Sequence, residues 1–163
     1  MPNDKIHIIN GDVLNVQKSI ICHQVNCLGI MGGGVAKQIK DKYPNVFTEY
    51  KKLCESVSYK DCETKLLGTC QIIKCSDTNY VANLFGQREI GYNAIHTRYD
   101  AFTEAVRNLM ISVTAMNSEY SGLSIVMPYG IACGLGGGNW NIVYQILSDA
   151  AKYFDYNISL YKK

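Results

Sequence analysis

The sequence has 163 residues, of which 47% are hydrophobic and 18% charged, and its formal net charge is +2. This composition argues against disorder and predicts one folded domain over residues 1–163, and the small net charge argues against sequence-specific nucleic-acid binding. No apolar stretch is long enough for a membrane span and no signal-peptide-like segment occurs, so we expect a cytosolic protein without a membrane partner.

Hydrophobic periodicity divides the chain into alternating strands and helices. In chain order, the predicted elements are strands at residues 6–9 and 19–25, helices at 35–43 and 44–54, strands at 69–74 and 80–85, a helix at 98–117, a strand at 124–127, a helix at 139–153 and a strand at 157–161. Pro44 is expected to end one helix and open the next, and Thr97 is expected to cap the long helix. Residues 56–65 read as a polar connection. This alternation predicts an α/β fold with helices on both faces of a mixed, largely parallel sheet.

Two glycine-rich loops each follow a predicted buried strand and precede a helix. The first contains Gly32-Gly33-Gly34-Val35, and the second spans Gly130 to Gly138. Glycine lets backbone N–H groups approach a ligand closely, and a helix N-terminus adds positive potential, so both loops suit a diphosphate. Neither loop has the spacing of a P-loop or of a dinucleotide-binding fingerprint. A tight turn is the structural alternative for either cluster.

Seven cysteines are scattered along the chain without a CxxC pair or zinc-ligand spacing, which predicts no metal site. In a reducing compartment we expect most of them to be small buried side chains. Cys27 and Cys133 lie near the glycine loops, where contact with a ligand is an alternative.

Taken together, these segments resemble the macrodomain family. The resemblance rests on Gly11-Asp12, on Val25-Asn26-Cys27 followed by Gly32 to Ala36, on Cys133 to Gly137, on Trp140 and on Ser159-Leu160-Tyr161. It covers almost the whole chain and implies a three-layer α/β/α macrodomain fold. Within the family, the chain is most similar to the branch of the yeast ADP-ribose 1″-phosphate phosphatase, the antitoxin macrodomains and the terminal ADP-ribose glycohydrolases.

The resemblance implies that the ligand is ADP-ribose or a derivative, with no additional cofactor. Asp12 would accept a hydrogen bond from the adenine amino group, Asn26 would contact the distal ribose, and the two glycine loops would hold the diphosphate and the nearer ribose. Tyr161 is a candidate for stacking on adenine, although a core role suits it equally well. The expected ligand-binding residues are Asp12, Val13, Asn26, Gly32, Gly33, Gly34, Val35, Ile131, Ala132, Cys133, Gly134, Leu135, Gly136 and Tyr161.

Two departures from the glycohydrolase branch argue against its lysine-based mechanism. That branch has a nucleophilic lysine after the strand corresponding to residues 80–85, where this chain has Gly86-Gln87 and then Arg88. An arginine cannot take over the role of such a lysine. The branch also has an acidic residue in the second loop, where this chain has Gly136.

The expected catalytic residues are therefore His23, Asn26 and Gln87. The unperturbed pKa of histidine suits His23 to proton transfer or nucleophilic attack, with a structural strand histidine as the alternative. Gln87 is a candidate for orienting a water or a ribose hydroxyl. The leading hypothesis is hydrolysis of ADP-ribose 1″-phosphate to ADP-ribose. The alternatives are a non-catalytic ADP-ribose reader and a hydrolase that removes ADP-ribose from a modified protein or nucleic acid.

Overall fold

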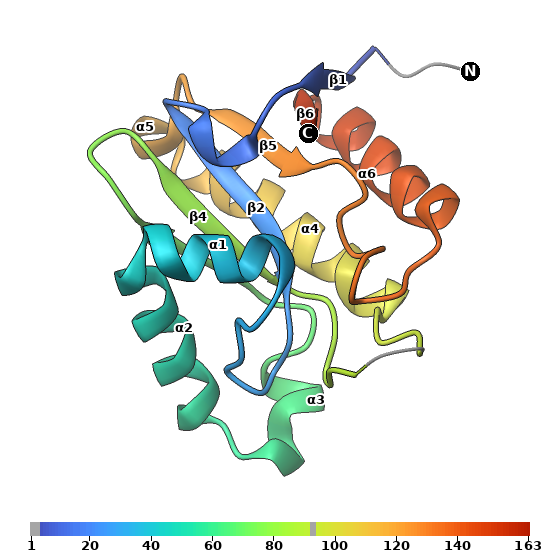
Figure 1. Cartoon of the computed structure of the whole chain (residues 1–163). Helices are drawn as coiled ribbons and strands as arrows, with labels where there is room; N and C mark the ends of the chain where they lie inside the picture. The colour runs from blue at the N-terminus through green and yellow to red at the C-terminus, as the bar shows by residue number, and fades with distance from the viewer. Residues whose placement is uncertain (1–3, 92–93) are drawn as a thin grey trace.

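The computed structural model describes residues 4–91 and 94–163 (Figure 1). The strands are β1 (Ile6–Asn10), β2 (Ser19–Val25), β3 (Cys70–Lys74), β4 (Tyr80–Phe85), β5 (Ser124–Pro128) and β6 (Ile158–Lys162). The α-helices are α1 (Gly34–Lys42), α2 (Pro44–Ser56), α3 (Cys62–Lys65), α4 (Tyr99–Ala115), α5 (Asn117–Tyr120) and α6 (Trp140–Phe154). Two short 3-10 helices, η1 (Val13–Asn15) and η2 (Tyr59–Asp61), complete the described elements.

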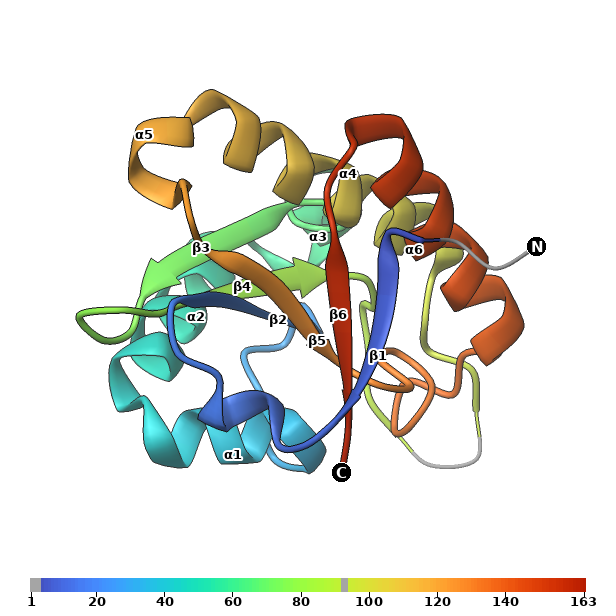
Figure 2. The same cartoon turned by 90° about the horizontal axis from the view of Figure 1, so that it is seen from above.

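These strands form a mixed sheet with the order β1-β6-β5-β2-β4-β3. In this sheet order, every neighbouring pair from β1 through β6, β5 and β2 to β4 is parallel. The edge strand β3 runs antiparallel to β4. Figure 2 shows α1 and α2 on one side of the sheet and α4 and α6 on the other. The predicted α/β/α layering and the largely parallel sheet are therefore confirmed.

Each face of the sheet has its own core because successive residues of a strand point to opposite faces. On β2, Ile20 and Cys22 belong to the core beneath α4 and α6, whereas Ile21 and Val25 belong to the core beneath α1 and α2. All four are at most 3% exposed, so β2 is buried on both faces, as expected for a central parallel strand.

The position of the glycine loops follows from where the helices go after β2 and β5. These two strands are neighbours and parallel. The helix after β2 packs on one face of the sheet, and the helix after β5 packs on the other. The connections therefore diverge at the carboxyl ends of this strand pair and leave a crevice, which is where open α/β sheets bind ligands.

Most predicted elements lie within one or two residues of the observed ones, and Pro44 does open α2. Two predictions are wrong. Residues 56–65 are not only a connection, because they contain η2 and α3. Thr97 does not cap α4, whose N-cap residue is Arg98, because the Thr97 hydroxyl donates instead to the backbone carbonyl of Ala132 at 2.7 Å. Within the described ranges, no helix is both long and apolar enough to cross a bilayer.

We predict that Leu109→Ala lowers the free energy of unfolding by roughly 2–5 kcal/mol, because Leu109 is fully buried where α4 packs on the sheet and its removal leaves a cavity. Ile111 lies on the same helix with 45% exposure, so Ile111→Ala is the matched control and should change stability by less than about 0.5 kcal/mol. Urea denaturation measures both. Equal losses in the two variants would contradict the assigned buried face of α4.

Candidate functional site

A cavity of about 500 Å³ lies at the carboxyl ends of β2 and β5. Its size is in the range of small-molecule and cofactor sites. The residues that line it are His23 to Asn26, Ile30, Gly32 to Ala36, Gln87, Ile90, Gly91, Pro128 to Ala132, and Gly134 to Gly136. Both glycine loops thus border one space, as the sequence predicted.

Most of the expected site residues lie around this cavity. They are His23, Asn26, Gly32, Gly33, Gly34, Val35, Gln87, Ile131, Ala132, Gly134, Leu135 and Gly136. Four expected ligand-binding residues are not among the lining residues, namely Asp12, Val13, Cys133 and Tyr161. A Cβ atom at Gly11 would lie 3.4 Å from the Tyr161 ring, so Tyr161 packs against the residue that precedes Asp12.

The side-chain amide of Asn26 holds the first loop through several hydrogen bonds. Its Oδ1 accepts from the backbone N–H of Leu28 at 2.9 Å and from the hydroxyl of Tyr50 at 2.8 Å. Its Nδ2 donates to the backbone carbonyl of Ile30 at 2.8 Å. The residue is 7% exposed, so the loop is held by a buried polar side chain whose partners come from the loop itself and from α2. Among the described residues, the second Nδ2 hydrogen has no acceptor.

The end of the first loop is the N-terminus of α1. Gly33 is the N-cap residue and provides no side-chain cap, so backbone N–H groups of the first turn are available to a ligand at the cavity wall. Gly34 has φ +58°, in the left-handed region that favours glycine. A Cβ at Gly33 would lie only 2.8 Å from Cδ1 of Leu135, which shows how closely the two loops approach each other.

The second loop is folded on itself and fastened to the segment before α4. The Ala132 carbonyl accepts from the N–H of Gly138 at 2.9 Å and from the Thr97 hydroxyl, and the Gly136 carbonyl accepts from the N–H groups of His96 and Thr97 at 2.8 and 2.9 Å. Ala132 has φ +69°, which is strained for a residue with a side chain and is typical of functional loops.

Gln24 connects three walls of the cavity, and its role was not predicted from the sequence. Its Nε2 donates to Oε1 of Gln87 at 2.8 Å and to Oγ1 of Thr97 at 2.9 Å. Gln87 in turn donates to the backbone carbonyl of Glu89 at 2.8 Å. Gln24 thereby joins the end of β2 to the segment after β4 and, through Thr97, to the second loop. A polar residue beside His23 at the end of a buried strand was the available signal.

The same contacts explain why position 136 is a glycine. A Cβ there would lie 2.6 Å from Oγ1 of Thr97, 2.8 Å from the Ala132 carbonyl oxygen and 2.8 Å from Nε2 of Gln24. An acidic side chain, as in the glycohydrolase branch, does not fit without displacing these groups.

His23 is buried on β2, and its Nε2 lies 2.6 Å from Oδ1 of Asn83 on β4. Its Nδ1 is buried without a hydrogen-bond partner in the described part of the chain. Burial lowers the pKa of His23 to about 4, against the opposing effect of the hydrogen bond to Asn83. The imidazole is therefore neutral at pH 7 and keeps one unprotonated ring nitrogen.

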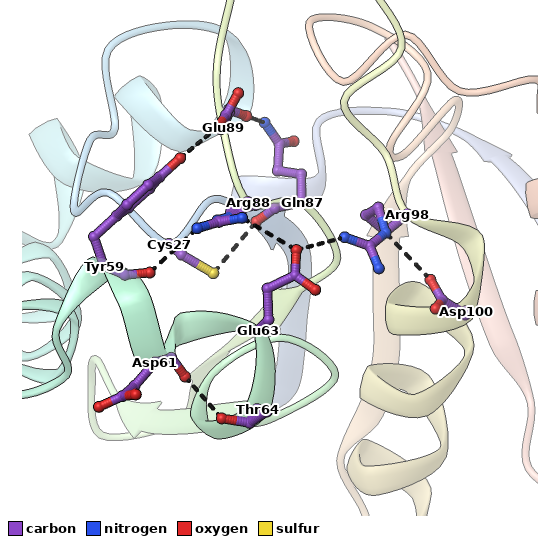
Figure 3. Close-up of polar contacts among 10 residues, drawn as sticks. All are labelled: Cys27, Tyr59, Asp61, Glu63, Thr64, Gln87, Arg88, Glu89, Arg98 and Asp100. Carbon is purple, nitrogen blue, oxygen red and sulfur yellow. Dashed lines mark hydrogen bonds and ion pairs between the residues drawn. The ribbon is translucent and has the colours of Figure 1, made fainter.

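No aspartate, glutamate, lysine or arginine is among the residues that line the cavity. Arg88, the basic residue nearest to the lysine position of the glycohydrolase branch, is directed elsewhere (Figure 3). Its guanidinium pairs with Glu63 at 3.2 Å and lies over the ring of Tyr59, 4.3 Å from the centroid. Glu63 also pairs with Arg98 at 3.2 Å. Anions in the cavity would therefore be bound by backbone N–H dipoles rather than by cationic side chains.

Asp12 is not among the residues that line the cavity, and its carboxylate interacts with Leu14 and Lys163. Its Oδ1 accepts from the N–H of Leu14 at 3.0 Å and caps η1, and its Oδ2 pairs with Nζ of Lys163 at 3.1 Å. These contacts, led by the bond from Leu14, lower the pKa of the carboxyl group, so Asp12 is an ionised acceptor at pH 7. A ligand amino group at Oδ2 would compete with the exposed Lys163.

The two cysteines nearest the glycine loops, Cys27 and Cys133, have protonated thiols at pH 7. No cluster of three potential metal-ligating side chains occurs within residues 4–91 and 94–163. Burial raises the pKa of the Cys27 thiol to about 12 and also raises that of Cys133. Cys27 is buried as expected, and its Sγ donates to the backbone carbonyl of Gln87.

We predict that Gly136→Ala lowers the free energy of unfolding by roughly 1–3 kcal/mol, because the added methyl group overlaps with Thr97 and Gln24. Gly134→Ala is the matched control on the same loop: a Cβ there has nothing within 4 Å and should cost less than about 0.5 kcal/mol. Thermal unfolding of both variants tests this, and a tolerated Gly136→Ala would refute the packing around Gln24.

A second prediction concerns the buried imidazole. Its pKa is about 4 in the folded chain against 6.5 normally, so below pH 6.5 protons bind preferentially to the unfolded chain. The contribution of His23 to stability is thus complete above pH 6.5 and decreases by up to about 3 kcal/mol as the pH falls to about 4. His23→Gln should lack this component of the pH dependence. Parallel stability curves for the two proteins would contradict a buried neutral His23.

Known proteins resemble the chain both in sequence and in fold. The family model described as Macro domain matches residues 22–147. The ADP-ribose 1″-phosphate phosphatase of Meyerozyma guilliermondii is 31% identical over 134 residues, which cover 76% of this chain and 74% of that protein. The structure of the macrodomain of Mycobacterium tuberculosis DarG superposes with a TM-score of 0.76 at 24% identity and covers 96% of both chains.

A shorter and stronger local match is found with a mycobacterial enzyme. The DNA ADP-ribosyl glycohydrolase of Mycobacterium tuberculosis is 44% identical over 46 residues, which cover 28% of this chain. The match spans only 13% of the length of that enzyme.

Proposed function

The chain belongs to the macrodomain family, and we propose that it binds ADP-ribose and hydrolyses an ADP-ribose derivative, with ADP-ribose 1″-phosphate as the leading substrate. The observation that carries this proposal is the cavity between the two glycine loops at the carboxyl ends of β2 and β5. Its volume and its backbone donors suit a ribose joined to a diphosphate.

The diphosphate would lie between the N-terminus of α1 and the second loop. Both are glycine-rich, both border the cavity, and Leu135 brings them into close approach. Because charged side chains are absent from the lining residues, phosphate oxygens would be recognised through hydrogen-bond geometry more than through net charge.

The adenine would extend beyond the cavity toward Asp12. This carboxylate follows Gly11, which packs against Tyr161, and its Oδ2 pairs with the exposed Lys163. An ionised carboxylate is an acceptor for the adenine amino group, and the adjoining tyrosine offers a face for stacking. Val13 would contribute its backbone at the same place.

Hydrolysis of the 1″-phosphate would take place at the distal end of the cavity, beside His23 and Asn26. A water oxygen bonds to phosphorus, and the bond between phosphorus and the 1″ oxygen breaks. His23 accepts one proton from the water and returns it to solvent, and the released 1″ oxygen takes up one proton. The position of His23 at the cavity supports this role, and at pH 7 its neutral imidazole has one unprotonated nitrogen, although its lowered pKa makes it a weaker base than a free imidazole. The name of the Meyerozyma relative supports the choice of substrate.

Removal of ADP-ribose from a modified macromolecule is the second candidate, supported by the local identity to the mycobacterial glycohydrolase. Two observations weigh against a lysine-dependent version of it here. Arg88 is paired with Glu63 away from the cavity, and Gly136 has no room for an acidic side chain. A water-based version would use Gln87, which lines the cavity.

We expect the purified protein to release phosphate from ADP-ribose 1″-phosphate and His23→Gln to lower kcat by about 100-fold or more, the lower range for loss of a general base. His7→Gln is the matched control, because His7 is exposed on the edge strand β1 and bonds to Asn157. Phosphate release, followed by a coupled colour assay, measures all three proteins. Full turnover by His23→Gln would exclude His23 from the reaction, and absence of turnover by the wild type despite ADP-ribose binding would favour a reader.

A further inference from the structure

A chain of hydrogen-bonded amide groups runs from His23 across the neighbouring strands to α2. Nε2 of His23 lies 2.6 Å from Oδ1 of Asn83, and Nδ2 of Asn83 donates to Oε1 of Gln71 at 3.0 Å. Nε2 of Gln71 then donates to the backbone carbonyl of Glu49 on α2 at 3.2 Å. We call these three side chains and the terminal carbonyl the amide chain. The side chains come from neighbouring strands, in the order β2, β4 and β3.

The direction of every hydrogen bond in the amide chain follows from its last member. The backbone carbonyl of Glu49 can only accept, so Gln71 must direct its NH₂ group toward it. The carbonyl group of Gln71 then faces Asn83, which must present its own NH₂ group. Oδ1 of Asn83 is left for His23, and an amide oxygen can only accept.

It follows that Nε2 of His23 carries the proton and that Nδ1 does not. His23 is 2% exposed and Asn83 is fully buried, so water does not compete for these positions. Nδ1 is buried and has no hydrogen-bond partner in the described residues, yet His23 borders the cavity. A neutral imidazole whose tautomer is fixed in this way offers one basic nitrogen.

We propose that Asn83 and Gln71 are positioning residues, which hold His23 as its Nε2–H tautomer so that Nδ1 is the atom that accepts the proton of the reacting water. The proposal rests on the hydrolytic function proposed above and names the parts of the chain that prepare His23 for it. Neither Asn83 nor Gln71 is among the residues that line the cavity, so both act only through His23. This arrangement differs from a carboxylate-oriented histidine, because the orienting group is neutral and does not stabilise an imidazolium.

The tautomer is directly measurable in ¹⁵N-labelled protein by long-range ¹H–¹⁵N correlation spectra of the histidine rings. His23→Gln assigns the His23 signals among the three histidines of the chain. At pH 7 the wild type should show a neutral His23 with the proton on Nε2. A proton on Nδ1, or a charged ring, would overturn the proposal whether or not the protein hydrolyses any substrate. Failure of this inference and failure of the proposed function are therefore distinguishable.

Substitutions of Asn83 and Gln71 test whether these residues fix the tautomer of His23. Asn83→Leu keeps a similar volume and removes the acceptor, so His23 should lose its single tautomer, and kcat for phosphate release should fall by about 10-fold or more with KM changed by less than about 2-fold. Asn83→Asp keeps an acceptor for Nε2–H, so Nε2 should stay protonated, and the added carboxylate should raise the pKa of His23 because it stabilises the imidazolium. Gln71→Leu, at a partly buried position on the edge strand β3, frees the Asn83 amide to rotate and should give a mixture of tautomers. An unchanged tautomer and unchanged kcat in Gln71→Leu and Asn83→Leu would overturn the proposal.

Discussion

The parallel pairing of β2 with β5 is the constraint on which the site depends. Because the chain leaves β2 toward one face of the sheet and leaves β5 toward the other, a crevice opens where the two strands end. Both glycine loops begin at this crevice, and the N-terminus of α1 borders it. Because β2 is buried on both faces, the first loop extends from a strand in the core of the fold.

The described residues that line this crevice have neutral side chains. Asn26 holds the first loop, and Gln24 joins the second loop to the segment that follows β4. Arg88, which follows Gln87 in the chain, is paired with Glu63 (Figure 3). In the proposed function, such a site would select its ligand by shape and by the direction of backbone N–H groups. Burial also keeps His23 neutral at pH 7.

The sequence was sufficient to predict the strands and the cavity walls, because buried apolar runs and glycine clusters act locally. It did not predict the roles of Gln24 and Thr97, since both depend on contacts between segments far apart in the chain, such as the bond from Thr97 to the Ala132 carbonyl. Thr97 looked like a helix cap because it precedes an acidic first turn, but its hydroxyl has a buried acceptor elsewhere. The reason for glycine at position 136 became clear only once these neighbours were in place.

Calorimetric titration of ADP-ribose into the protein at low and at high salt tests the central claim most directly. We predict saturable binding of one ligand per chain, with a dissociation constant that changes by less than about threefold, because backbone dipoles rather than cationic side chains hold the diphosphate. The absence of binding at high ligand concentration would contradict the assignment of the cavity. An affinity that falls steeply with salt would contradict its neutral mode of recognition.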